Sequence, residues 1–165
     1  AYFRDSCQMR VQQFIQENHL RWDSLGEFLA LAASLEHLAE RFDNPKAKVL
    51  SEALDAASTN YLMENHSPSR HVGELDNRGT HVYLATAWAR AIADQTDNAE
   101  LAARFTPVAE ALEGGLDRIL GQLVDAQGPE MDIGGYYQPD IAKASAAMRP
   151  SPVLNEIVDG LLTPA

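Results

Sequence analysis

The chain has 165 residues, of which 45% are hydrophobic and 22% charged, and its formal net charge is −11. This size suits one domain with its own core, and no apolar run approaches the roughly 20 residues of a membrane-spanning helix. A surface this acidic repels nucleic acid and anionic lipid, so neither is an expected partner. No secretory leader is evident, and the single cysteine, Cys7, fits a reducing compartment. We therefore expect a cytoplasmic protein.

Helical periodicity organises the first third of the chain. Apolar residues spaced i, i+3 and i+4 from Val11 predict a helix that ends near His19. A second helix is predicted to begin at Ser24, which has capping-box spacing with Glu27, and to end before residues 43–45. Asn44 and Pro45 suit the cap and the first position of a third helix that reaches Tyr61. The second helix carries one apolar stripe, made of Leu25, Phe28, Leu29, Ala32, Leu35, Leu38 and Ala39.

The rest of the chain alternates helices with two polar loops. Residues 66–80 are rich in turn formers, and Thr80 is expected to cap a helix that runs to Ile92, with a short strand over residues 81–83 as the alternative. A short helix over residues 97–105 and a separate one starting at Thr106-Pro107 are predicted next. A second irregular stretch, residues 127–138, precedes helices over residues 140–148 and 151–162. The predicted fold is mainly α, a multi-helix single domain with two long polar loops.

The first loop reverses the sign of this acidic chain locally. Residues 66–81 contain Arg70, Arg78 and three histidines against only Glu74 and Asp76. Arginine holds a phosphate or carboxylate through a planar fork of donors, so the loop is a candidate anion site. The alternative is that the two arginines pair with neighbouring acids.

The Arg21-Trp22-Asp23-Ser24 sequence is a second candidate for binding an anion. It precedes a predicted helix N-terminus, where unpaired amides and the helix dipole favour negative charge. The alternative is a core tryptophan, a surface arginine and a capping residue, and for this sequence taken alone it is the favoured interpretation.

Other chemical signals are weak. The histidines lack the spacing of a zinc site, and Asp132 before Gly134-Gly135 indicates a turn rather than an acid or base. No nucleotide-binding glycine motif, P-loop or nucleophile elbow is present, and no pair of acids is arranged to hold a catalytic divalent metal. The residues predict binding and no reaction of their own.

Several long runs, in order, resemble the C-terminal region of monomeric NADP-dependent isocitrate dehydrogenases. The resemblance covers nearly the whole chain from about Val11, and the family's enzymes are several times longer. The matching runs are Val11-Gln12-Gln13-Phe14, residues 17–28 around Arg21-Trp22-Asp23, Ser67-Pro68-Ser69-Arg70, residues 73–79, Asp132-Ile133-Gly134-Gly135-Tyr136-Tyr137 and Met148-Arg149-Pro150-Ser151.

The resemblance implies oxidative decarboxylation of isocitrate to 2-oxoglutarate, a step of the tricarboxylic acid cycle, with reduction of NADP and with Mg²⁺ or Mn²⁺ bound. It places the metal ligands and most isocitrate ligands upstream of this region, so it assigns no catalytic or metal-binding residue to this chain. It implies that the region lies in the smaller domain of the family and helps to close the coenzyme site. The resemblance divides the chain into a divergent N-terminal segment, residues 1–10, and an expected helical C-terminal isocitrate dehydrogenase domain, residues 11–165.

The same resemblance assigns the coenzyme-binding residues. Arg21 falls near the adenosine 2′-phosphate. Where the family reads Ser-Ala-Pro-Lys-His, this chain reads Ser6-Cys7-Gln8-Met9-Arg10, so the lysine is lost to Met9 and Arg10 stands for the charge of the histidine. The implied coenzyme residues are Arg21, Trp22, Asp23, Arg70, Arg10 and Ser6.

We therefore expect a coenzyme-binding part of this enzyme that does not turn over isocitrate alone. Its expected partners are NADP and the remainder of the enzyme chain, with self-association through exposed apolar surface. The alternative is a helical scaffold or interaction module that derives from such an enzyme and no longer uses coenzyme.

Overall fold

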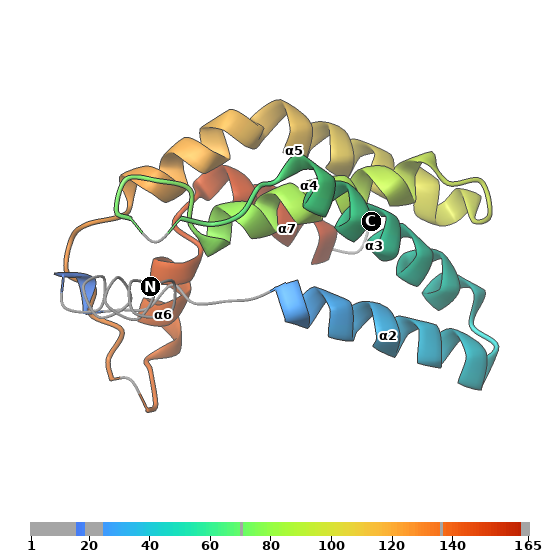
Figure 1. Cartoon of the computed structure of the whole chain (residues 1–165), viewed down its shortest axis with the longest axis horizontal. Helices are drawn as coiled ribbons and strands as arrows, with labels where there is room; N and C mark the ends of the chain where they lie inside the picture. Colours follow the sequence, from blue (N-terminus) through green and yellow to red (C-terminus); the bar gives the residue numbers. More distant parts are fainter. Residues whose placement is uncertain (1–15, 19–24, 70, 136, 163–165) are drawn as a thin grey trace.

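The computed structural model describes residues 16–18, 25–69, 71–135 and 137–162. These residues form six helices and no strand, which confirms the prediction of a mainly α, single-domain chain (Figure 1). The helices are α2 (Leu25–Phe42), α3 (Pro45–Glu64), α4 (Asn77–Asp94), α5 (Ala99–Asp125), α6 (Ile141–Met148) and α7 (Pro152–Leu162). None of them is long and apolar enough to cross a bilayer. The predicted N-terminal segment, residues 1–10, and most of the predicted helix after Val11 lie outside the described residues.

The helices pack mainly against their neighbours in the chain. Each of α2, α3 and α4 packs against the next helix, and α7 packs against α5. Figure 1 shows α5 across the top of the molecule with α4 beneath it, while α2 lies at the outer edge. The N-terminal end of α4 therefore lies near the two long loops, away from the α2–α3 turn.

Two clusters of buried side chains hold this arrangement together. The larger one joins α4, α5 and α7, and the smaller one joins α3, α4 and α5. Phe105 of α5 packs against both clusters, so the middle of α5 connects them. The buried residues are Val82, Ala89, Ala109, Leu112, Ile119 and Leu123 in the first cluster, and Val49, Ala53, Ile92 and Leu101 in the second.

The predicted start of α3 is confirmed. Asn44 is its N-cap and accepts a hydrogen bond from the Ala47 amide at 3.1 Å, and Pro45 occupies the first position. The carboxamide satisfies one amide that no helical carbonyl can reach, and the proline has no amide to leave unpaired. This helix start depends on a few adjacent residues, which is why the sequence alone predicts it.

The start of α4 differs from the prediction. Thr80 is not the cap but lies inside the helix, and residues 81–83 are helical, so the strand alternative is also wrong. Asp76 is the N-cap and accepts hydrogen bonds from the amides of Arg78 at 2.9 Å and Gly79 at 3.2 Å. A carboxylate that satisfies two amides favours the earlier start over a threonine hydroxyl.

The predicted break at Thr106-Pro107 is wrong as well. Residues 99–125 form one continuous helix with the proline in its interior. Leu101, before the proline, and Ala109 and Leu112, after it, are all buried in the core. Burial of one apolar face along the whole length outweighs the local preference of proline to end a helix.

The apolar stripe of α2 is only partly covered by the described residues. Ala32 is the one buried residue of α2. Leu31, Leu38 and Phe42, which share one side of the helix, have exposed fractions of 41%, 43% and 69%. An amphipathic helix with an uncovered apolar face favours association with another surface.

We expect the 165-residue chain to form dimers or higher oligomers at moderate concentration. Multi-angle light scattering should show a mass above that of the 18.1 kDa monomer, because association removes the α2 face from water. The double variant Leu38→Ser, Phe42→Ser should shift the mass towards the monomer, whereas Ile141→Ser, on the exposed face of α6, should not. A monomeric parent chain would contradict this expectation.

Candidate functional site

All six residues assigned to coenzyme binding lie outside the described residues. They are Arg21, Trp22, Asp23, Arg70, Arg10 and Ser6. Their roles stay predictions, but the described chain on either side of residues 19–24 and of Arg70 fixes where these two segments attach to the fold.

Described residues next to both segments line one cavity of about 250 Å³. Leu25, which directly follows residues 19–24, lines it, and so do Ser67 and Pro68, which precede Arg70. Its other walls come from the end of α3 and the first turns of α4, namely Tyr61, Leu62, Asn77, Thr80, His81 and Leu84. The volume is below the roughly 300–1,000 Å³ of pockets that enclose a drug-sized ligand, so the cavity has room for part of a coenzyme.

Ring contacts fix His81, which lines this cavity, and His66, which directly precedes the lining residue Ser67. His81 meets Phe28 of α2 edge to face, with ring centroids 4.9 Å apart. His66 stacks on Tyr83 at 3.8 Å and lies 2.9 Å, Nε2 to Oε2, from Glu64. No three His, Cys, Asp or Glu side chains in the described part of the chain are placed to hold a metal ion. The walls offer apolar surface with a few amide and hydroxyl groups, which suits a flat ring with polar edges.

A buried ion pair lies next to this cavity at the N-terminus of α4. Asp76 and Arg78 both have side chains that are almost fully buried, with 6% and 5% exposed. Arg78 donates through Nε at 2.9 Å and through Nη2 at 2.6 Å to Oδ2 of Asp76. The other carboxylate oxygen caps α4, so one aspartate both starts the helix and neutralises the arginine.

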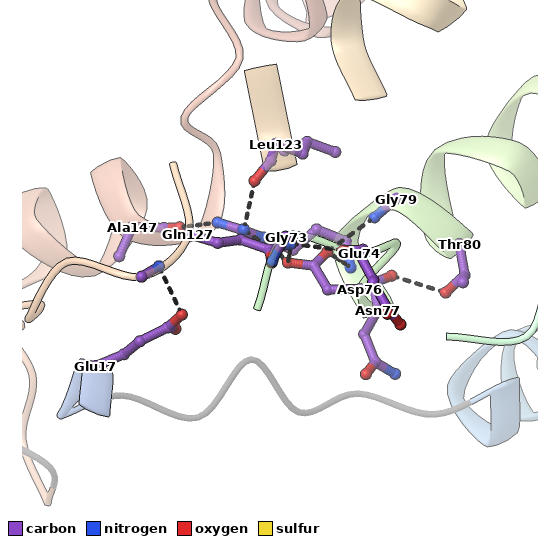
Figure 2. Close-up of polar contacts among 12 residues, drawn as sticks. Glu17, Gly73, Glu74, Asp76, Asn77, Gly79, Thr80, Leu123, Gln127 and Ala147 are labelled. Carbon is purple, nitrogen blue, oxygen red and sulfur yellow. Dashed lines mark hydrogen bonds and ion pairs between the residues drawn. The ribbon is translucent and has the colours of Figure 1, made fainter. Parts of the chain in front are cut away.

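The same arginine connects the ends of two more helices. Its Nη1 donates to the Ala147 carbonyl in the last turn of α6 at 2.8 Å, and its Nη2 to the Leu123 carbonyl near the end of α5 at 2.9 Å (Figure 2). Of the two interpretations open for Arg78, pairing with an acid is therefore correct, and its guanidinium is not directed at a bound anion. Carbonyls at helix C-termini lack helical partners, and a buried guanidinium satisfies them.

Gln127 joins this ion pair to the loop that carries Arg70. Its Oε1 accepts from the Gly73 amide at 2.7 Å, and its Nε2 donates to the Glu74 carbonyl at 2.9 Å and to Oδ2 of Asp76 at 3.1 Å (Figure 2). The side chain is 7% exposed. One carboxamide thus holds two successive residues of the loop against the start of α4.

Hydrogen bonds join the described residues of this loop to one another. The Ser69 amide donates to the Leu75 carbonyl at 2.7 Å, and the Ser69 hydroxyl donates to the Glu74 carboxylate. The His71 amide donates to the Ser69 hydroxyl at 3.2 Å. Both chain neighbours of Arg70 therefore have fixed partners. We call residues 69–75 the Arg70 loop.

Glu17 connects the chain just before residues 19–24 to the stretch that follows α5. It is fully buried, and its Oε1 accepts from the Gly128 amide at 2.8 Å (Figure 2). Its backbone carbonyl accepts from the Met131 amide at 2.6 Å. Residues 127–131, directly after α5, therefore contact both the chain before residues 19–24 and the Arg70 loop.

The second irregular stretch forms a turn, as predicted for Asp132. The Gly134 amide donates to Oδ1 of Asp132 at 2.8 Å, and Lys143 donates to the same carboxylate. The hydrogen bond from Lys143, and after it that from Gly134, lowers the pKa of Asp132 below its ordinary value. An exposed carboxylate held ionised in this way fastens the turn to α6 and is a poor proton donor at neutral pH.

Three residues that fasten these loops were not predicted. For Asp76 a signal was available, because aspartate before a helix is a strong N-cap. Glu17 and Gln127 gave no signal. Their partners Gly128 and Gly73 lie 111 and 54 residues away along the chain, and the sequence contains nothing that pairs them.

Comparison with known proteins gives one consistent result. The family model described as monomeric isocitrate dehydrogenase matches residues 5–159. Isocitrate dehydrogenase (NADP) 2 of Psychrobacter sp. (strain 13A) is 56% identical over 156 residues, which are 94% of this chain and 21% of that protein. Isocitrate dehydrogenase (NADP) 2 of Colwellia maris is 55% identical over 157 residues, 95% and 21%. Isocitrate dehydrogenase (NADP) of Azotobacter vinelandii is 55% identical over 150 residues, 91% and 20%. The chain spans about a fifth of the length of these curated relatives.

Proposed function

The chain belongs to the monomeric isocitrate dehydrogenase family, and we propose that it is the coenzyme-binding part of an NADP-dependent isocitrate dehydrogenase, the enzyme that oxidatively decarboxylates isocitrate. Arg21 and Arg70 bind phosphate groups of NADP, with Arg21 at the adenosine 2′-phosphate. Trp22 and Asp23 shape the adenosine end of the site, and Arg10 and Ser6 supply further contacts.

One observation supports this proposal: Leu25, which follows the Arg21 segment, and Ser67 and Pro68, which precede Arg70, line the same cavity. The residues that line it come from three helices and a loop, and they combine leucine side chains with Asn77, Thr80 and His81. Such a mixture fits a nucleotide, whose base buries a flat apolar face while its edges and its ribose form hydrogen bonds. The charges of Arg21 and Arg70 would counter the phosphate charge in a chain whose net charge is −11.

The described residues do not fit a divalent metal site, because no three potential ligands converge among them. We propose that the ligands of Mg²⁺ or Mn²⁺ and most isocitrate ligands belong to the upstream part of the enzyme. The role of this chain is then to bind and orient the coenzyme. It does not turn over isocitrate alone, and activity of the isolated chain with isocitrate, Mg²⁺ and NADP would contradict this.

Substituting both arginines should separate coenzyme binding from a purely structural role. In a calorimetric titration with NADPH, the variant Arg21→Ala, Arg70→Ala should bind at least about a hundredfold more weakly than the parent, because each charge-assisted hydrogen bond contributes roughly 1.5–3 kcal/mol. The variant Arg41→Ala, Arg118→Ala removes the same charge from exposed positions on α2 and α5 and should bind like the parent. Equal binding by the parent and by the Arg21, Arg70 variant would contradict the proposal.

The alternative is a helical scaffold or interaction module without coenzyme. Two features favour it: the altered run from Ser6 to Arg10 and the uncovered apolar face of α2. The same titration distinguishes the two functions when the upstream four-fifths of a relative is supplied in trans. NADPH binding by the assembled protein supports the coenzyme role, and its absence supports the scaffold.

A further inference from the structure

We propose that Glu17 and Gln127 are positioning residues for the two segments that contain Arg21 and Arg70. Glu17 acts through its contact with residues 128–131, Gln127 acts through its contacts with the Arg70 loop, and neither touches the coenzyme. This inference rests on the proposed function, because it concerns how the same site is kept in shape. No sequence motif or family run singles out either contact; both are found only in the folded chain.

The Glu17 contact anchors the chain just before the first segment. Arg21 lies four residues after Glu17, and four extended residues span at most about 14 Å. The fully buried Glu17 carboxylate is held at the Gly128 amide, and its backbone carbonyl at the Met131 amide. The position from which the Arg21 segment departs is therefore fixed relative to the end of α5.

The Gln127 contact anchors the second segment from the other side. Arg70 lies three residues before Gly73, a reach of at most about 11 Å. Gln127 binds the Gly73 amide and the Glu74 carbonyl, and Ser69 closes the Arg70 loop onto Leu75. The third bond of the carboxamide, to Asp76, ties the loop to the first turn of α4, which lines the cavity.

The chemistry of the two side chains favours positioning over direct binding. Gln127 uses its carbonyl oxygen for Gly73 and its amide nitrogen for Glu74 and Asp76, so it has little capacity left for a ligand. Glu17 carries the same sign of charge as a phosphate, and the two would repel each other. Both act by reducing the freedom that the two segments would otherwise lose when the coenzyme binds.

The test is a double-mutant cycle on NADPH affinity, with the chain assembled with the upstream part of a relative where this is needed for binding. Gln127→Met keeps the volume of the side chain and removes its polar contacts. We expect it to raise the Kd for NADPH about tenfold, equivalent to about 1.4 kcal/mol. If Gln127 acts through Arg70, the effect disappears in an Arg70→Ala background and persists in an Arg21→Ala background. A general loss of stability would weaken binding in both backgrounds alike.

Glu17 provides a second, independent pair of variants. Glu17→Ala should also raise the Kd, whereas Glu17→Gln, which keeps an acceptor for the Gly128 amide, should restore it. This pair keeps the inference open to contradiction even if Gln127→Met does not fold. Ser151→Ala is the matched control, because Ser151 is fully buried and bonds to Gln122 of α5 and to the Leu154 amide of α7. It should lower stability and leave the Kd unchanged.

The outcomes distinguish the inference from the proposed function. A parent that fails to bind NADPH contradicts the proposed function and the inference with it. A parent that binds, together with Gln127→Met and Glu17→Ala variants of unchanged Kd, overturns the inference alone. An equal loss for Gln127→Met with and without Arg70 also overturns it.

Discussion

Replacing Arg78 with methionine is expected to lower the free energy of unfolding by about 3–5 kcal/mol, the usual cost of leaving one member of a buried ion pair without its partner. Such a loss is a large share of the roughly 5–15 kcal/mol that stabilises a domain. The carboxylate of Asp76, 6% exposed, would remain in the interior without a counter-charge, and the Leu123 and Ala147 carbonyls would lose their donor. Three helix ends meet at this guanidinium, so the loss affects α4, α5 and α6 together. Urea unfolding followed by circular dichroism at 222 nm measures it.

A double variant tests whether the lost stability comes from the unpaired Asp76 carboxylate. Asp76→Asn, Arg78→Met removes both charges and keeps an acceptor for the N-cap, so it should be more stable than Arg78→Met alone. On the same helix, Arg90 forms a fork with Glu113 at 2.8 and 2.5 Å, but the pair is exposed to solvent. The Glu113 pKa is lowered by this contact, yet water screens the pair, and Arg90→Ala should cost far less than Arg78→Met. An Arg78→Met variant as stable as the parent would contradict this expectation, because it would show that the buried Asp76 carboxylate needs no counter-charge.

The contrast between these two arginines indicates how far the sequence predicts the site. Both lie in helix α4 with acids close in sequence or in space, and nothing in their local sequence shows that one is buried at a junction and the other exposed. The resemblance to the family predicts which segments bind coenzyme. It does not predict what holds the segments in place. The contacts of Glu17 and Gln127 form only when distant parts of the chain meet.

The fold shows the same division between local and distant causes. The start of α3 at Asn44 and Pro45 was predictable, because two adjacent residues determine it. The predicted N-cap of α4, Thr80, is four residues after the observed one, Asp76, because the advantage of Asp76 includes its buried contacts with Arg78 and Gln127. In α5 the local preference of Pro107 is real, but the predicted break at this residue is wrong. Pro107 does disfavour a helix at that point, but the packed core keeps the helix continuous through it.

Because Pro107 disfavours the helix that contains it, replacing it should have a large effect on stability. Pro107→Ala is expected to raise the free energy of unfolding by about 2 kcal/mol. Proline costs roughly 3 kcal/mol in a helix interior relative to alanine, and about 1 kcal/mol of this is returned because proline restricts the unfolded chain. The residue is exposed and lies in the ninth position of α5, so alanine can restore the missing amide hydrogen bond without disturbing the core. Chemical unfolding of the variant and its parent measures the gain.

Pro45→Ala is the matched control for that gain, because Pro45 stands at the first position of α3, where its missing amide costs nothing. Alanine there should be neutral or slightly destabilising. If Pro107→Ala gave no more stability than Pro45→Ala, Pro107 would not destabilise α5. A local distortion of the helix would then have to accommodate the proline ring. A gain at position 107 alone would show that the core, through Phe105 and the buried residues on both sides of the proline, holds the helix continuous against a measurable local cost.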